Sequence, residues 1–510
     1  MKKIGALLLL IASLPRLFAQ TNSPATHPLS LDDCFTEALQ HNLDVQIEQT
    51  APEISLYDLK AAYSGYDPLF SFSGQHLYND SGASFQNGQQ ISGSEYNEQY
   101  YSSGLSGGTP WGLSYNLGGN VSRFTGNDVS TGLNGSGNPI SIYSPFQTSS
   151  GQVGALSLTQ PLLKNFWIDS TRLTIRINKN RLQYSEQGLR FQIITTVTAV
   201  ENAYYELIYA RENVKVEQEA LVLAQTQLDD DNRRMVVGTV AERGGTIEQD
   251  EAQVAQSRAN LIAAQNTLSM DQNALKTLLT DDYAQWHDVD IEPTGTLTAA
   301  RQLFDVQDSW NKGMTDRPDL VQARLNLEQQ GIQLKYYRNQ LFPEVNLIGS
   351  YGYNGAGQEF SDTFNQFAAA NRPFYSYGAQ LSIPLGNIGA RNQLKAGKAT
   401  EKQLLLQLKQ LEQNVMVQID NDVKAAQSAW ESADATRQQR IYAEAALNAE
   451  QGKYAVGKST TFTVLQLQNN LTSARSQEIR ALANYNQALA NLAAAEGSSL
   501  QRDQLDLKVK

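Results

Sequence analysis

The chain repeats its own order of motifs once, and this internal repeat limits what it can fold into more than any other feature. The matched segments are 38–45 with 313–320, Pro68 with Pro343, 158–162 with 381–385, and 235–238 with 454–457. A repeat this long, with its elements in a constant order, predicts two structurally equivalent halves within one body. It does not fit a solenoid, which needs three or more short units.

The placement of proline predicts long helices. All fourteen prolines lie outside two windows, 162–292 and 385–510, which are rich in Ala, Leu, Gln, Glu, Asn and Arg. Proline inside a helix costs about 3 kcal/mol, so helix can run unbroken in these windows. We expect long helices over 170–237 and 390–456, each about 100 Å at 1.5 Å per residue. Helices of that length need parallel neighbours, as in a coiled coil.

Heptad spacing predicts a second, packed helix after each long one, over 246–280 and 461–496. The positions are Ile247, Val254, Leu261, Leu268 and Leu275 in the first half, and Val464, Leu471, Tyr485 and Leu492 in the second, with Glu478 as the exception. Seven-residue spacing marks a packing seam between helices. A compact amphipathic bundle would show the same heptads, but the expected helix lengths argue against it.

Each half opens with a shorter helix and continues into strands. The first helix is expected from Leu31 to about Ser64, with Ser30 and Asp33 as its N-terminal cap, and its equivalent over about 304–339. Alternating residues then predict four strands, over 69–78, 154–161, 344–353 and 376–384.

The first half carries about 50 extra residues, which we interpret as an inserted loop over 79–153. This segment is dominated by Gly, Ser, Asn, Gln and Tyr, and we expect a hairpin within it over 100–117. Whether that hairpin joins the other strands stays open. Aromatic residues gather near the strands, where they could form the girdles of a membrane barrel or the pairs of a soluble sheet.

The N-terminal residues 1–19 have the pattern of a secretory signal peptide, with Lys2 and Lys3 before an apolar run that is too short to span a membrane. No later stretch approaches about 18 apolar residues, so we expect any membrane insertion to use a closed β-barrel. The net charge of −12 argues against nucleic-acid binding. Cys34 is the only cysteine, which excludes an internal disulfide and favours a buried position in a helix.

The ordered and repeated set of motifs resembles the outer-membrane efflux protein family, the TolC-like export ducts. The resemblance rests on Asn42-Leu43-Asp44 and Arg317-Pro318-Asp319-Leu320, on 159–166, and on the Val-Gly pairs at 237–238 and 456–457. It implies a mainly α fold with a membrane β-barrel. In that fold three chains would each give four strands to a 12-stranded β-barrel, continued by a 12-helix periplasmic α-barrel.

The expected organisation has five parts. They are the signal peptide 1–19, the first repeat 20–280, an equatorial linker 281–305, the second repeat 306–496 and a C-terminal tail 497–510.

The resemblance also implies a docking tip for a periplasmic adaptor protein at the Val-Gly turns. The matching positions are Val237, Gly238, Thr239, Val240, Val456, Gly457, Lys458 and Ser459. The alternative is that each glycine simply lets the chain reverse direction.

A gate is expected beside this tip, although the chain departs from the family's acidic ring and arginine contact. Thr463, Gln466 and Ser459 occupy the corresponding positions, and Tyr454 retains the family's aromatic residue. The gate candidates are therefore Tyr454, Thr463, Gln466, Asp229, Asp230 and Asp231. The competing interpretation of the three aspartates is a solvated face, because Asp229 and Asp230 stand four residues before Arg233 and Arg234.

No motif indicates catalysis, a cofactor site or a metal site, since the four histidines are scattered and no phosphate-binding loop is present. We expect a passive, gated, homotrimeric exit duct of a tripartite efflux or type I secretion system, located in the outer membrane and extending into the periplasm. Its partners would be an adaptor protein, an inner-membrane transporter and outer-membrane lipid. The alternatives are a periplasm-spanning scaffold or surface adhesin that uses the inserted loop, and a metal-ion duct, which the five methionines do not favour.

Overall fold

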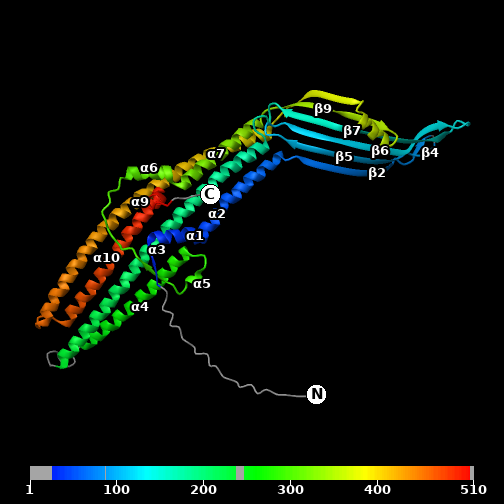
Figure 1. Cartoon of the computed structure of the whole chain (residues 1–510). Helices are drawn as coiled ribbons and strands as arrows, with labels where there is room; N and C mark the ends of the chain where they lie inside the picture. The colour runs from blue at the N-terminus through cyan, green and yellow to red at the C-terminus, as the bar shows by residue number, and fades with distance from the viewer. Residues whose placement is uncertain (1–25, 87, 237–245, 506–510) are drawn as a thin grey trace, which may run out of the picture. The chain divides into compact units, whose positions relative to one another are not determined.

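Segments that are far apart in the sequence combine into two units in the computed structural model, which describes residues 26–86, 88–236 and 246–505 (Figure 1). Unit 1 contains the described residues of 26–46, 192–313 and 417–505, and unit 2 those of 47–191 and 314–416. The expected signal peptide, 1–19, lies outside the described residues.

Four long helices dominate the chain. They are α3 (Ser170–Val236), α4 (Thr246–Leu279), α9 (Ile388–Ala455) and α10 (Thr461–Glu496). α3 and α9 have 67 and 68 residues, as expected for segments without an internal proline. Within the described ranges, no helix has both the length and the hydropathy needed to cross a membrane.

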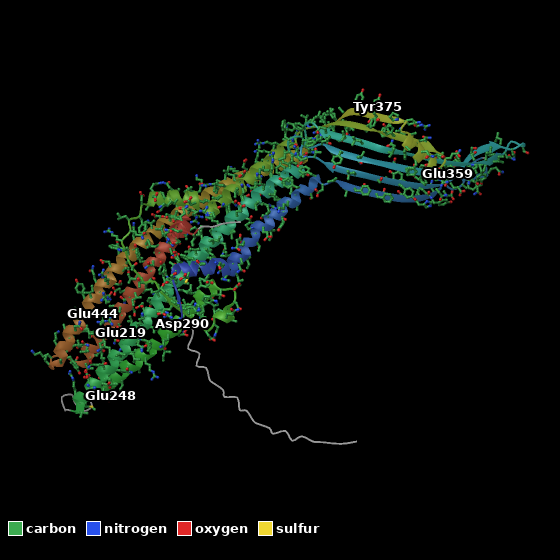
Figure 2. All side chains as sticks on the ribbon, viewed as in Figure 1. Glu219, Glu248, Asp290, Glu359, Tyr375 and Glu444 are labelled. Carbon is green, nitrogen blue, oxygen red and sulfur yellow. The ribbon has the colours of Figure 1, made fainter. Side chains whose placement is uncertain are left out.

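In unit 1, α10 contacts each of the other three long helices. Arg475 of α10 reaches Glu219 of α3 at 2.7 Å and Glu444 of α9 at 3.8 Å, and the two carboxylates are labelled in Figure 2. Asn469 of α10 exchanges side-chain hydrogen bonds of 2.7 and 3.0 Å with Gln253 of α4. These polar contacts set the register of the four helices along their exposed sides.

The predicted heptad of α10 is the apolar seam of this packing. Its four residues, Val464, Leu471, Tyr485 and Leu492, are all buried. On α4, Leu261 and Leu275 are buried, whereas the other three heptad residues are half-buried. Glu478, the exception, pairs with Arg440 of α9, so a charge at this position is stabilised by an ion pair instead of by apolar packing.

The first expected helix is divided into α1 (Leu31–His41) and α2 (Leu43–Ala62). The Ser30–Asp33 capping box is confirmed. The break comes at Asn42, which is buried and whose side chain accepts a hydrogen bond of 3.1 Å from the Val45 amide and donates one of 3.1 Å to the Leu278 carbonyl. The prediction of one continuous helix was wrong because this side chain caps a new helix start.

The second half shows an equivalent break between α6 (Val306–Asp316) and α7 (Pro318–Asn339). Pro318 opens α7 at a position where its missing N–H costs nothing. Arg317 holds the side chain of Asp319 at 2.8 Å in front of that first turn. The Asn-Leu-Asp and Arg-Pro-Asp motifs therefore both mark helix starts.

A small parallel strand pair closes unit 1 beside α3. β1 (Thr26–Leu29) pairs with β8 (Asp290–Pro293). The short helix α5 (Tyr283–Trp286) precedes β8, and α11 (Ser499–Arg502) follows α10. The fully buried Tyr204 of α3 donates to the Leu29 carbonyl at 3.1 Å and accepts from the Gly295 amide at 3.0 Å. Cys34 is buried, as predicted, and burial raises the pKa of its thiol to about 12.

An ion pair ties the end of unit 1 to α3. Glu201 is 2% exposed and pairs with Arg502, which also contacts Asp503 at 2.8 Å. Burial raises the pKa of Glu201 to about 7, against the opposing effect of Arg502. The ionised form of Glu201 at neutral pH therefore depends on this arginine.

Replacing Arg502 with alanine is expected to lower the free energy of unfolding by about 2 kcal/mol at pH 8, because a buried carboxylate loses its partner. At pH 5 Glu201 is protonated in the variant and the loss should be smaller. Thermal unfolding at the two pH values measures this. Arg475→Ala removes two more exposed contacts, with Glu219 and Glu444, and serves as the control. It should cost less than about 1 kcal/mol. Equal losses in both variants would contradict the prediction.

Unit 2 contains one antiparallel sheet of six strands in the order β10-β9-β7-β6-β5-β2 (Figure 1). Its strands are β2 (Leu69–Asp80), β5 (Glu95–Gly108), β6 (Ser114–Leu133), β7 (Pro139–Pro161), β9 (Glu344–Gly357) and β10 (Pro373–Ser382). The short 3-10 helix η1 (Tyr63–Tyr66) precedes β2, and a short hairpin of β3 (Ser84–Gln86) with β4 (Gln89–Ile91) follows β2. α8 (Phe360–Ala369) connects β9 with β10.

The interpretation of 79–153 as an inserted loop was wrong. β5, β6 and most of β7 fall in this segment, and the hairpin expected over 100–117 is the meeting point of β5 and β6 within the main sheet. The chain consequently has six strands in this sheet and not the expected four. The Gly- and Ser-rich composition indicated a loop, but these residues form strands that pair within the main sheet.

Candidate functional site

The end of α3, the end of α9 and the start of α10 meet around one buried carboxylate, Asp231. The Tyr454 hydroxyl donates to its Oδ1 atom. Its Oδ2 atom accepts from the Thr461 hydroxyl at 2.8 Å and from the Gln227 amide at 3.0 Å. Asp231 has no exposed surface, so these three donors replace the water that it would otherwise bind.

A second buried carboxyl, Asp250 near the start of α4, lies beside Asp231. Burial and then the charge of Asp231 raise the pKa of Asp250 to about 7. Within the described ranges no hydrogen-bond donor reaches either oxygen of Asp250, whereas Asp231 accepts three hydrogen bonds. Asp250, which lacks such donors, is therefore the carboxyl of the two whose pKa is raised.

Arg234 contacts these residues through Tyr454. Its guanidinium lies 4.3 Å from the centre of the Tyr454 ring, and its Nη1 donates to the Tyr454 carbonyl at 3.3 Å. Burial raises the pKa of the Tyr454 hydroxyl, which keeps it protonated and able to donate. We call Gln227, Asp231, Arg234, Asp250, Tyr454 and Thr461 the tip cluster.

The tip cluster links the ends of α3, α9 and α10 through hydrogen bonds that are fully or partly buried, and Asp250 of α4 lies beside them. Tyr454 comes from α9 and Thr461 from α10, whereas Asp231 comes from α3 and Asp250 from α4. Moving α9 and α10 away from α3 would remove two donors from Asp231 together. The tip cluster can hold the helix ends in one arrangement, and it can release them when the hydrogen bonds to Asp231 break.

The turn after α9 confirms the conformational role of Gly457. Its φ of 72° lies in the left-handed region. Its amide donates to the Tyr454 carbonyl at 3.0 Å, and the Lys458 amide donates to the Lys453 carbonyl at 2.9 Å. These two bonds form a Schellman motif, which satisfies the last carbonyls of the helix.

Within the expected docking tip, Val456 is 68% exposed and Lys458 is exposed as well. Ser459 instead turns back and donates to Glu450 at 2.6 Å. The expected docking positions Val237, Gly238, Thr239 and Val240 lie outside the described residues. A docking role for the turn stays a prediction.

The other gate candidates lie away from the tip cluster. The Thr463 hydroxyl is 3.0 Å from that of Thr460, whose side chain caps the start of α10, and Gln466 is exposed. Asp229 and Asp230 are also exposed, and Asp230 lies 3.6 Å from Arg233. Of the three consecutive aspartates only Asp231 faces inward, because successive helical residues are about 100° apart.

Sequence reasoning missed Gln227, Arg234, Asp250 and Thr461 as members of this site, although a signal for Asp250 was available. Asp250, Ser257 and Ala264 follow each other at seven-residue spacing, and all three are buried on α4. A charged residue at the start of a buried heptad row is unusual, because an aspartate is almost never fully buried unless it is paired. Such a position indicates a buried partner, here Asp231.

The profile of the family described as outer membrane efflux protein matches residues 124–280 and 314–498, which is more than half of the chain. The chain belongs to this family. The family consists of channel proteins, and the protein's location is the outer membrane.

Individual relatives are distant. The pyoverdine export outer membrane protein OpmQ of Pseudomonas aeruginosa is 24% identical over 356 residues, which cover 68% of this chain and 70% of that protein. The outer membrane protein TolC of Salmonella enteritidis is 24% identical over 315 residues, covering 61% and 63% respectively.

A similar fold has been solved for the outer membrane protein VceC of Vibrio cholerae. It superposes with a TM-score of 0.65 at 18% identity, over 92% of this chain and 96% of that one. At this identity the likeness concerns the fold alone.

Proposed function

We propose that the protein is the exit duct of a tripartite efflux or type I secretion system, and that it works as a homotrimer. The observation that carries this proposal is the sheet of unit 2, in which β2 and β10 are edge strands. Unpaired backbone groups are not tolerated in lipid, so a sheet in the outer membrane needs further copies to close it. The number three is the one that the family resemblance implies.

The tip cluster supports a gate at the periplasmic end of the duct. In the resting state Tyr454 and Thr461 hold α9 and α10 against Asp231 of α3. Opening separates these helix ends, and the exposed turn at Val456 and Lys458 is where an adaptor protein would press on them. An inner-membrane transporter supplies the energy, because no nucleotide-binding motif occurs in this sequence.

The light-scattering mass of the detergent-purified protein, corrected for bound detergent, tests the proposal. We expect a mass of about three chains, and discrete conductance steps after insertion into a planar bilayer. A folded monomer would contradict both the trimer and the duct, because one chain leaves both sheet edges open. A trimer without conductance under any condition would contradict the duct alone.

The adhesin alternative loses its main support. It requires 79–153 as a free working loop, whereas most of this segment is strand within the six-stranded sheet.

A further inference from the structure

We infer that β5 and β6 are part of the membrane wall, so that three copies close an 18-stranded barrel instead of a 12-stranded one. The count follows from six strands in each of three copies, and it rests on the proposed trimer. Each open edge of the sheet would thus pair with the opposite edge strand of a second copy of this chain.

β5 and β6 pair with their neighbours over most of their length. β5 pairs with β2 from Leu69↔Ser106 to Asp80↔Glu95, and with β6 at every position from Glu95 to Gly108. β6 also pairs with β7, in a register that includes Leu117↔Leu156. Two strands bound this completely between β2 and β7 cannot leave the wall without opening both ladders.

One apolar row crosses all six strands. The paired residues are, from edge to edge, Phe70, Leu105, Leu117, Leu156, Tyr351 and Tyr375. Directly paired residues share one face of a sheet, so this row lies on a single face. Phe70 is 68% and Tyr375 is 74% exposed at its two ends, and Tyr375 is labelled in Figure 2. Large exposed apolar side chains in an outer-membrane protein indicate the face that meets lipid.

The adjacent row points to the other face and is mostly small and polar. Its paired residues are Leu69, Ser106, Asn116, Ser157, Ser350 and Ser376. Ser350 and Ser376 lie within 2.7 Å of each other through their hydroxyls, as do Ser73 and Ser102 on the same face. In these two rows, β5 and β6 therefore place lipid-type and lumen-type residues on the same faces as the other four strands do.

The lengths and directions of the six strands are also compatible with a closed membrane barrel. The shortest of the six strands, β10, has 10 residues, and β5 and β6 have 14 and 20. A tilted membrane strand needs about 9–11 residues. Because the six strands alternate in direction, β2 and β10 run antiparallel, so β2 of one copy can extend the sheet at β10 of the next.

A barrel of 18 strands is roughly 1.5 times as wide as one of 12, because diameter grows about linearly with strand number. The extra strands thus widen the outer exit, and the helix ends remain the place where passage is restricted.

The test uses single cysteines in the full-length protein, reconstituted in lipid vesicles and treated with a charged, water-soluble maleimide. Leu117→Cys and Asn116→Cys probe the two faces of β6. Tyr351→Cys and Ser350→Cys, in the same two rows on β9, are matched controls for a strand of the expected four. The native Cys34 is buried and serves as the unreactive background.

We expect Asn116→Cys to react as fast as Ser350→Cys, and Leu117→Cys to react about tenfold or more slowly, like Tyr351→Cys, because lipid excludes a charged reagent. Equally fast reaction at Leu117→Cys and Asn116→Cys in a protein with the mass of three chains would overturn the inference and leave the proposed duct intact. A mass other than three chains overturns the count of 18 together with the proposed trimer. Counting strands in an image of the purified trimer, 18 against 12, provides a readout that needs no substitution.

Discussion

Replacing Asp231 with alanine is expected to open the gate. The substitution removes the carboxylate that accepts from the Tyr454 hydroxyl, the Thr461 hydroxyl and the Gln227 amide. The two hydroxyls, 2.9 Å apart, then have only one acceptor between them, and the amide has lost its own. Each unsatisfied buried group costs about 1–3 kcal/mol, so the packed arrangement of helix ends loses most of its polar stabilisation. We expect a higher resting conductance in planar bilayers and a lower midpoint of thermal unfolding.

Asp230→Ala is the matched control, because it removes the preceding carboxylate of the same helix. Asp230 is exposed and contacts Arg233 at 3.6 Å on the surface, where such pairs contribute at most about 1 kcal/mol. Its conductance and stability should stay at the wild-type values. If Asp231→Ala channels conduct no more than Asp230→Ala channels, the tip cluster is not the gate.

The second large effect is a dependence of the gate on pH. The folded-state pKa of Asp250 is raised to about 7 from an ordinary value of 3.8, by burial and by the charge of Asp231. Between these two values the folded protein binds a proton that the unfolded chain does not, so stability falls as pH rises through this window. Above about pH 7 both Asp231 and Asp250 are charged and repel each other. Arg234 is the one positively charged residue of the tip cluster as defined above. We expect the conductance of the wild-type protein to increase between about pH 6 and pH 8.

Asp250→Asn isolates this titration, because asparagine has the shape of the protonated acid and stays neutral at every pH. Its channels should keep the low conductance of the wild type at pH 6 and show a flat profile up to pH 8. Thermal unfolding over the same range provides an independent readout. A wild-type profile that persists unchanged in Asp250→Asn would assign the pH dependence to another group.

The helical part of the fold was predictable from sequence because its signals are local. Proline is excluded from α3 and α9 by its missing N–H, and the heptad of α10 corresponds to a seam whose four apolar residues are buried. The break at Asn42 was not predicted, since the hydrogen bond that its side chain makes to Leu278 joins residues 236 positions apart.

The sheet was only half predictable. Strands beginning at Leu69 and Glu344 follow prolines and alternate clearly, whereas β5 and β6 consist largely of Gly, Ser, Asn and Tyr. For a membrane strand the lumen side can be small and polar, so the alternation has low contrast and resembles a loop. Only the pairing of Leu105 and Leu117 with rows on the other strands shows that these residues share an apolar face.

The candidate gate shows most clearly what sequence determined and what only the tertiary structure decided. Sequence alone determined the long helices, the turn at Gly457 and the family, because each depends on residue order over short distances or on the summed pattern. It also placed Tyr454 and the aspartates 229–231 near the turns. The tertiary structure alone decided that Asp231 is the inward-facing carboxylate and that Asp250, from another helix, lies beside it with a raised pKa. Burial and pairing of charges arise from the packing of separate helices, which no local pattern contains.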